Sequence, residues 1–218
     1  LAAVDRAESE PELAWRVNAE APAAMARAAQ TLDVPLVQVS TDYVFDGSKD
    51  GAYLATDAVA PISVYGRSKL GGELAVQTLC KKHWILRTSW VFSEHGHNFV
   101  KTMLRLARER DVLTVVNDQH GQPTYAGDLA RLIGDLLRDV ASAPETALPF
   151  GRYHVGAGPV VTWRDFAERI VTRAGALGQI GRVPTVTGIP TSAYPTPARR
   201  PRNSVLAADA SLTARYPG

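Results

Sequence analysis

The sequence contains a single cysteine, Cys80, and no apolar run long enough to cross a membrane. One cysteine excludes an internal disulfide framework, and the lack of an apolar run of about 18 residues argues against a transmembrane helix. The 24 basic and 22 acidic residues are interspersed and leave a formal charge of +2, so no basic stripe favours nucleic acid or an anionic membrane. We therefore expect a cytoplasmic protein without a nucleic-acid or membrane partner, in which Cys80 is a core thiol.

Two kinds of site lack their sequence signatures. The five histidines show no metal-ligand spacing supported by carboxylates or cysteines, so the sequence indicates no metal. There is also no glycine-rich turn of the kind that holds a dinucleotide diphosphate at a helix N-terminus. Gly156-Ala157-Gly158 is followed by Pro159 and lacks a third glycine, so we exclude it as such a turn.

The stretch from Val39 to Lys69 carries the strongest signal that is present. The hydrophobic run 35–39 ends abruptly in hydroxyl and carboxylate groups, as a buried strand does when its carboxyl end delivers side chains to a site. Tyr65 and Lys69 are four residues apart in an expected helix over 65–82 and so share one face. An ammonium group near a phenol favours the phenolate, and we expect it to lower the pKa of Tyr65 from about 10. This pair is typical of acid/base chemistry.

The rest of the chain alternates between helical and strand patterns. Apolar residues three and four apart predict helices over 11–31, 97–110 and 126–140, and apolar runs predict strands over 35–40, 83–89, 112–116 and 152–155. Thr162 is the expected N-cap of a further helix, with Asp165 in its first turn. The proline-rich segment 184–201 excludes a regular helix or a central strand. Its arginines, Arg199, Arg200 and Arg202, would either grip a diphosphate or form surface salt bridges.

Four longer strings carry a family resemblance. They are Ser-Thr-Asp-Tyr-Val-Phe-Asp-Gly (40–47), Arg-Thr-Ser-Trp-Val-Phe (87–92), Asn-Asp-Gln-His-Gly-Gln-Pro-Thr (117–124) and Tyr-Pro-Thr-Pro-Ala-Arg-Arg-Pro-Arg-Asn-Ser (194–204). In order, and along nearly the whole chain, they resemble the dTDP-4-dehydrorhamnose reductases among the extended short-chain dehydrogenase/reductases. Against that family the sequence would begin after the fourth Rossmann strand and stop before a final helix, so we expect the first strands and the glycine-rich loop to lie outside it.

The resemblance implies a fold and a division of the chain. The fold is α/β, with a Rossmann-like parallel sheet and a smaller α/β lobe for the substrate. Residues 1–90 and 115–148 are expected in the nucleotide-binding part, and residues 91–114 and 149–218 in the substrate-binding lobe. The implied reaction is the NADPH-dependent reduction of the 4-keto group of dTDP-4-dehydro-L-rhamnose to dTDP-L-rhamnose.

The resemblance also assigns residues to the site. Thr41, Tyr65 and Lys69 match the Ser/Thr-Tyr-Lys catalytic group of the superfamily. The cofactor would be NADPH, with NADH as the alternative, while Mg²⁺ stays open without support from the sequence. The partner would be a dTDP-sugar, and a homodimer also stays open. The implied cofactor-binding residues are Val39, Tyr65, Lys69 and Ser89, and the implied substrate-binding residues are Thr41, Asp42, Tyr43, Trp90 and Asn98.

One position favours simple reduction over related chemistry. Sugar-nucleotide dehydratases of this superfamily carry Thr-Asp-Glu where this sequence has Thr41-Asp42-Tyr43, and a tyrosine cannot replace the carboxylic acid that assists the loss of water. Epimerases continue differently after their own serine or threonine. Two alternatives remain: another sugar-nucleotide reductase, and a non-catalytic subunit like the regulatory subunit of methionine adenosyltransferase, which resembles the same reductases.

Overall fold

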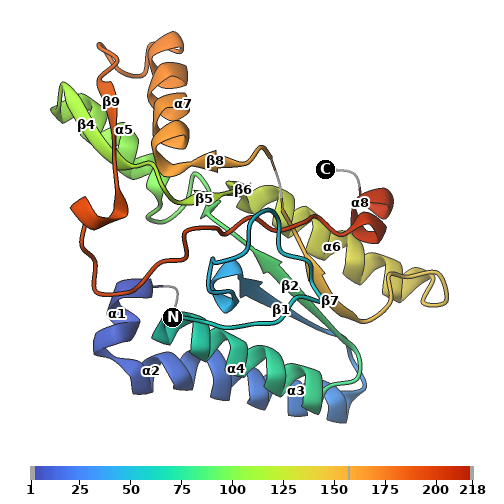
Figure 1. Ribbon diagram of the computed structural model, residues 1–218. Coiled ribbons are helices and arrows are strands. Elements are labelled where there is room, and N and C mark those ends of the chain that lie inside the picture. The colour runs from blue at the N-terminus through green and yellow to red at the C-terminus, as the bar shows by residue number, and fades with distance from the viewer. Residues whose placement is uncertain (1–2, 157, 217–218) are drawn as a thin grey trace.

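Three parallel strands form the centre of the computed structural model, which describes residues 3–156 and 158–216 (Figure 1). They are β1 (Leu36–Thr41), β2 (His83–Thr88) and β7 (Gly151–His154), in the order β1-β2-β7. β1 and β2 run in register, so Thr41 at the end of one lies beside Thr88 at the end of the other. Parallel strands need crossover connections, which the helices between them supply.

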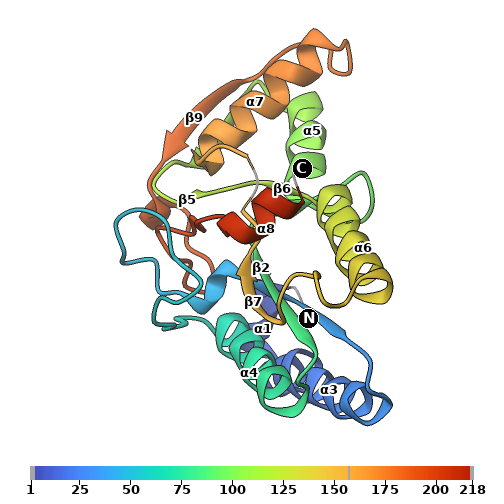
Figure 2. The same ribbon diagram turned by 90° about the vertical axis from the view of Figure 1, so that its right-hand side faces the viewer.

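Helices cover both faces of this sheet, as Figure 2 shows. On one face lie α1 (Val4–Ser9), α2 (Pro11–Trp15), a π-helical turn (Arg16–Glu20), α3 (Ala21–Leu32) and α4 (Val64–Leu79), and on the other lie α6 (Ala126–Ser142) and α8 (Ala210–Arg215). Strand β2 serves both layers: Ile85 packs against α3 and α4, whereas Trp84 and Leu86 pack against α6. A strand buried on both faces explains the unbroken apolar run in the sequence.

A smaller lobe projects from one end of the sheet (Figure 1). It contains α5 (Phe99–Glu109), β4 (Val112–Val116), α7 (Trp163–Ala176) and β9 (Thr185–Ile189), with β4 and β9 paired in parallel. Helix α7 begins with the expected capping box, because Thr162 and Asp165 each accept a hydrogen bond from the backbone of the other. The core of the lobe is apolar, with Met103, Leu113 and Val171 among its buried members.

Short elements join the lobe to the sheet. They are β3 (Val91–Phe92) paired in parallel with β6 (Thr124–Tyr125), β5 (His120–Gly121) paired antiparallel with β8 (Val161–Thr162), and two 3₁₀ turns at Asp42–Val44 and Thr191–Ala193. The returning C-terminal segment also contacts the loop after β1, because Tyr53 exchanges backbone hydrogen bonds with Val205 and Ala207. This segment therefore covers the carboxyl end of β1.

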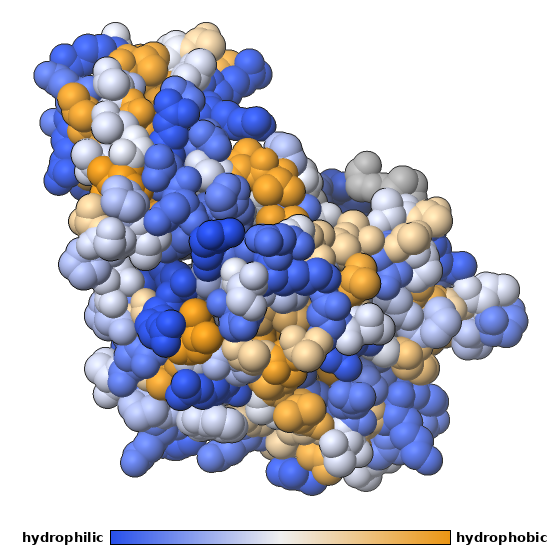
Figure 3. Space-filling model, viewed as in Figure 1, coloured by the Kyte–Doolittle hydropathy of each residue, from blue (hydrophilic) through white to orange (hydrophobic). Residues whose placement is uncertain are grey.

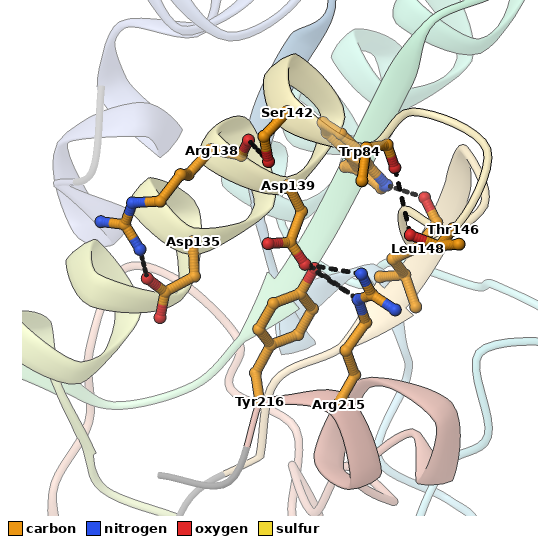
Figure 4. Close-up of polar contacts among 10 residues, drawn as sticks. Trp84, Asp135, Arg138, Asp139, Ser142, Thr146, Leu148, Arg215 and Tyr216 are labelled. Atoms are coloured by element: carbon orange, nitrogen blue, oxygen red, sulfur yellow. Dashed lines mark hydrogen bonds and ion pairs between the residues drawn. The ribbon is translucent and has the colours of Figure 1, made fainter.

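Polar contacts fix the last helix onto α6, as Figure 4 shows. The Asp139 carboxylate on α6 accepts hydrogen bonds from Arg215 at 2.9 Å and from the Tyr216 hydroxyl at 2.8 Å. In the same region the Trp84 indole N–H donates to the Leu148 carbonyl oxygen at 3.2 Å. These bonds close the layer on this face of the sheet.

The elements agree with the sequence patterns, with three differences. A π-helical turn interrupts the expected helix over 11–31, and strand β9 forms inside the proline-rich segment, where its position at a sheet edge tolerates the flanking prolines. Strand pairing also differs from the expected division of the chain at β7, which lies in the range expected for the lobe but joins the main sheet. Ala157, in the excluded Gly-Ala-Gly stretch, lies outside the described residues.

The surface in Figure 3 shows hydrophobic residues in small groups among hydrophilic ones, and the lobe as a protrusion from the larger body. None of the helices in the described part of the chain is long and apolar enough to cross a membrane.

Candidate active site

The site lies at the carboxyl ends of β1 and β2. Thr41 is the last residue of β1 and is 5% exposed. Beside it, at the end of β2, the Thr88 hydroxyl donates a hydrogen bond to the Thr124 hydroxyl at 3.1 Å. Asp42 and Tyr43 follow Thr41 in a 3₁₀ turn, whose N-cap is Thr41 itself, because its hydroxyl oxygen accepts from the Tyr43 N–H. The polar residues that end the apolar run thus turn sharply at the strand end, as the sequence predicts.

Helix α4 approaches this turn closely enough to bring Tyr65 to it. A Cβ atom at Gly66 would overlap the carbonyl oxygen of Tyr43, so only glycine permits this contact. Ser63 caps the helix by accepting from the Gly66 N–H at 3.1 Å. The rings of Tyr43 and Tyr65 then meet edge to face, 5.5 Å apart. The phenol expected to act in catalysis is therefore held against the end of β1.

Tyr65 lies beside Thr41, whose hydroxyl group stabilises the phenolate form of Tyr65. The pKa of Tyr65 is raised to about 12, mainly by burial and also by the nearby Asp42 carboxylate, while Thr41 acts in the opposite direction. The expected lowering of this pKa by Lys69 is therefore wrong. The physical reason is the desolvation of the phenolate on burial. A phenol with a raised pKa stays protonated at neutral pH and is available as a proton donor.

Lys69 lies on the same face of α4 as Tyr65 and reaches the end of β1. Its ammonium donates to the carbonyl oxygen of Val39 at 2.7 Å, and burial lowers its pKa. An ammonium group has three N–H donors, so ribose hydroxyls can accept the others. Val39 is 37% exposed beside it. These groups fit the nicotinamide ribose of a dinucleotide, whereas the sequence has no glycine-rich turn for its diphosphate.

Asp42 is the most deeply buried acid of the site, at 3% exposure. Its Oδ1 accepts from the Thr41 hydroxyl at 3.0 Å, whereas Oδ2 has no hydrogen-bond partner among the described residues. Burial raises the pKa of Asp42 to about 6, against the lowering effect of hydrogen bonds from Ser204 and Thr41. A buried, half-satisfied carboxyl group at a strand end is typical of a ligand-binding position.

A family model described as the RmlD substrate binding domain matches residues 1–215. The dTDP-4-dehydrorhamnose reductase of Shigella flexneri is 49% identical over 204 residues, which cover 94% of this chain and 67% of that protein. The chain belongs to the dTDP-4-dehydrorhamnose reductase family.

Two further relatives agree with this assignment. The dTDP-4-dehydrorhamnose reductase of Sinorhizobium fredii is 47% identical, over 95% of this chain and 69% of that protein. A crystal structure of a dTDP-4-dehydrorhamnose reductase from Bacillus anthracis in complex with NADP has a TM-score of 0.88 at 37% identity, and covers 99% of this chain and 71% of that one. The chain spans about two thirds of the length of the curated relatives it matches. The likeness to the Bacillus anthracis structure confirms the predicted Rossmann-like α/β fold.

In this member of the dTDP-4-dehydrorhamnose reductase family, the side chains of the other expected site residues already have contacts within the protein. The Ser89 hydroxyl is buried and donates to the Gln122 carbonyl oxygen at 2.8 Å. Asn98 caps α5 by accepting from the Lys101 N–H, and its amide donates to the Ser93 carbonyl oxygen at 2.7 Å. The side-chain oxygen of Asn98 can still accept a second hydrogen bond, whereas its amide N–H groups are engaged by backbone carbonyl oxygens. Trp90 is half-buried and stacks on Trp163.

The sequence patterns missed a buried ionic network behind the site. The Arg87 guanidinium, fully buried on β2, donates to both carboxylate oxygens of Glu73 on α4, at 2.9 and 2.6 Å. Ser40 on β1 donates to the same carboxylate. Both Arg87 and Ser40 directly precede a threonine of the site. The only signal in the sequence was a charge inside an apolar strand, since buried arginines need a partner.

A second structural contact joins α4 to the helices beneath it. The Asn18 amide donates to the Ser68 hydroxyl at 3.0 Å, so Asn18 has a structural role.

At the other end of the chain, Arg200 forms a salt bridge to Asp5 at 2.7 Å, which confirms the salt-bridge alternative for that arginine. Arg199 and Arg202 are exposed. The loop over the site is therefore tied to the first helix by Arg200.

Proposed function

We propose that this protein catalyses the NADPH-dependent reduction of the 4-keto group of dTDP-4-dehydro-L-rhamnose to give dTDP-L-rhamnose. The observation that carries the proposal is the position of Tyr65 beside Thr41 at the end of β1, with Lys69 one helical turn from Tyr65. It stands in a chain of the dTDP-4-dehydrorhamnose reductase family, one of whose members has been crystallised with NADP.

The side chains divide the work of ketone reduction. The bound cofactor supplies the hydride. Tyr65, which is protonated at neutral pH, donates a proton to the carbonyl oxygen as negative charge develops there. Thr41, beside the phenol, presents a second polar group to the same oxygen. Lys69 and the carbonyl oxygen of Val39 hold the nicotinamide ribose, with Ser89 at the end of the neighbouring strand.

The residues around this centre support a sugar-nucleotide ketone as substrate. Asp42 offers an unpartnered carboxyl oxygen that suits a sugar hydroxyl. Tyr43, in contact with the Tyr65 ring, supplies a flat apolar surface in place of the acid that a dehydratase needs. Trp90 offers a second aromatic surface beyond β2. Cytoplasmic location and a dimeric state stay predictions, which fractionation and sedimentation would test.

Replacing Tyr65 with phenylalanine tests the proposal. In the natural chain that carries this sequence, Tyr65→Phe should lower kcat by about 10²–10⁴-fold, because the proton donor is lost, while the affinity for the dTDP-sugar changes little. Turnover is followed by the loss of NADPH absorbance, and binding by calorimetry with dTDP. Tyr216→Phe makes the same chemical change far from the site, at the Asp139 contact, and should keep kcat unchanged.

The outcomes separate the candidate functions. Equal kcat in Tyr65→Phe and in the unaltered protein would remove Tyr65 from the mechanism. A folded, unaltered protein that binds dTDP-sugars but never oxidises NADPH would instead favour the non-catalytic role of a regulatory subunit. Turnover of a different dTDP- or UDP-linked ketone in preference would favour another sugar-nucleotide reductase.

A further inference from the structure

Trp90 has an unusual backbone for its residue type. Its φ angle is +50°, in the left-handed region that bulky residues rarely adopt. Such a conformation persists only where the surrounding structure determines it, and it is often found where a side chain must point in one direction. Trp90 lies between the end of β2 and the start of β3, in the connection from the main sheet to the lobe.

The indole of Trp163 determines where the Trp90 ring lies. The two rings stack with their centroids 3.6 Å apart and an angle of 10° between their planes. A Cβ atom at Gly121 of β5 would overlap the Trp90 indole, so the backbone of β5 also touches the ring. Both tryptophans are partly exposed, in contrast to the fully buried Trp84. Trp163 also packs against the apolar core of the lobe.

Trp163 is itself held firmly. It is the first residue of α7, directly after the capping-box residue Thr162. Its indole N–H donates to the Gln119 side-chain oxygen at 3.2 Å, and the Gln119 amide donates to the Thr191 hydroxyl at 3.1 Å. The ring of Phe99 packs against it at 4.6 Å between centroids. Trp163 is therefore fixed to the lobe, whereas Trp90 belongs to the segment that leaves strand β2 of the main sheet.

We propose that Trp163 is a positioning residue that holds the Trp90 indole in the orientation in which it contacts the sugar nucleotide. The proposal rests on the proposed function, and it adds a residue from the lobe to the recognition of the substrate. The stack crosses the junction between sheet and lobe, where β5, β8 and the start of α7 meet in Figure 1. Correct placement of the lobe is therefore required for tight binding of the sugar nucleotide, but not for binding of the cofactor.

Two substitutions at one position separate positioning from general stability. Trp163→Phe keeps an aromatic face against Trp90, whereas Trp163→Leu removes it. We expect Trp163→Leu to raise the KM for the dTDP-sugar by about two- to tenfold, the usual worth of an aromatic pair, with the KM for NADPH unchanged. Trp163→Phe should restore most of this loss. Trp15→Leu, which removes a more exposed tryptophan on α2, should leave both KM values unchanged.

The far-ultraviolet circular dichroism spectrum gives a readout that does not depend on activity. Two stacked indoles produce an exciton couplet, which should be present in the unaltered protein and in Trp15→Leu, and absent from both Trp163 variants. A folded Trp163→Leu protein with an unaltered KM for the dTDP-sugar would overturn the positioning role. So would equal KM increases in the phenylalanine and leucine variants. An unaltered protein that shows the couplet but neither binds nor reduces a dTDP-sugar would contradict the proposed function instead.

Discussion

The main sheet and the smaller lobe have different interiors. Between β1, β2 and α4 the sheet encloses an ion pair and a serine, with Arg87 at 0% and Glu73 at 2% exposure. The lobe has an apolar core, and the buried polar residues next to it, Gln119 and Thr162, carry no charge. Ser40, Arg87 and Glu73 come from the three elements that carry Thr41, Thr88 and Tyr65. The difference indicates that the buried polar contacts fix the positions of β1, β2 and α4 relative to one another. The lobe carries no catalytic side chain that needs such positioning.

Breaking the ion pair should have the largest effect on stability. Glu73→Ala leaves the buried Arg87 without a counter-charge, and we expect a loss of about 3–5 kcal/mol in the free energy of unfolding, measured by urea titration. The double variant Glu73→Leu with Arg87→Met should recover most of that loss, because no charge remains buried. A loss below about 1 kcal/mol in Glu73→Ala would show that the pair does not hold the sheet together.

The buried carboxyl group of Asp42, at the end of β1, makes the folding stability of the main sheet depend on pH. The pKa of Asp42 is raised in the folded state, from 3.8 to about 6, so the folded protein holds this proton more tightly and its stability falls as pH rises through that window. His154, whose pKa burial lowers to about 4, acts in the opposite sense, because stability is lost as pH falls from 6.5 towards 4. The unaltered protein alone would therefore show little of either effect.

The variant Asp42→Asn isolates the contribution of Asp42. The gain in the free energy of unfolding relative to the unaltered protein should be about 2 kcal/mol larger at pH 7 than at pH 4.5, since the asparagine never ionises. Urea unfolding at the two pH values measures this difference. An identical change at both pH values would mean that Asp42 ionises freely in the folded state.

The lobe should respond to a deletion of apolar volume without such a pH dependence. Val171 on α7 is fully buried, and Val171→Ala should cost about 1–2 kcal/mol of unfolding free energy through lost burial and a small cavity. The loss should be the same at pH 4.5 and pH 7, and kcat should be unaltered. A clear drop in kcat in Val171→Ala would contradict the separation of roles.

The smallest effect is expected at the capping box of α7. Thr162→Ala removes the side chain that accepts from the Asp165 N–H, and should cost about 1 kcal/mol in the free energy of unfolding. Thr162→Ser keeps the acceptor and is the matched control, measured by the same urea titration. If the serine variant lost as much as the alanine variant, the hydroxyl would not be the source of the stabilisation.

The sequence by itself determined the strands β1, β2 and β4, the helices that follow them, and the shared helix face of Tyr65 and Lys69. These features depend on local periodicity and on the rule that parallel strands present their carboxyl ends at one edge. The family strings were equally readable, because they are contiguous. The capping box of α7 was readable for the same reason, since its two residues are three positions apart.

Only the tertiary structure decided the contacts between distant segments. The pairing of Arg87 with Glu73, the bond between Arg200 and Asp5 and the stack of Trp90 on Trp163 join residues from separate elements. The direction of the Tyr65 pKa was also decided there, because it depends on how much water the folded chain removes from the phenol. Sequence periodicity specifies which face of an element is buried, but burial and partners follow from how the faces are brought together.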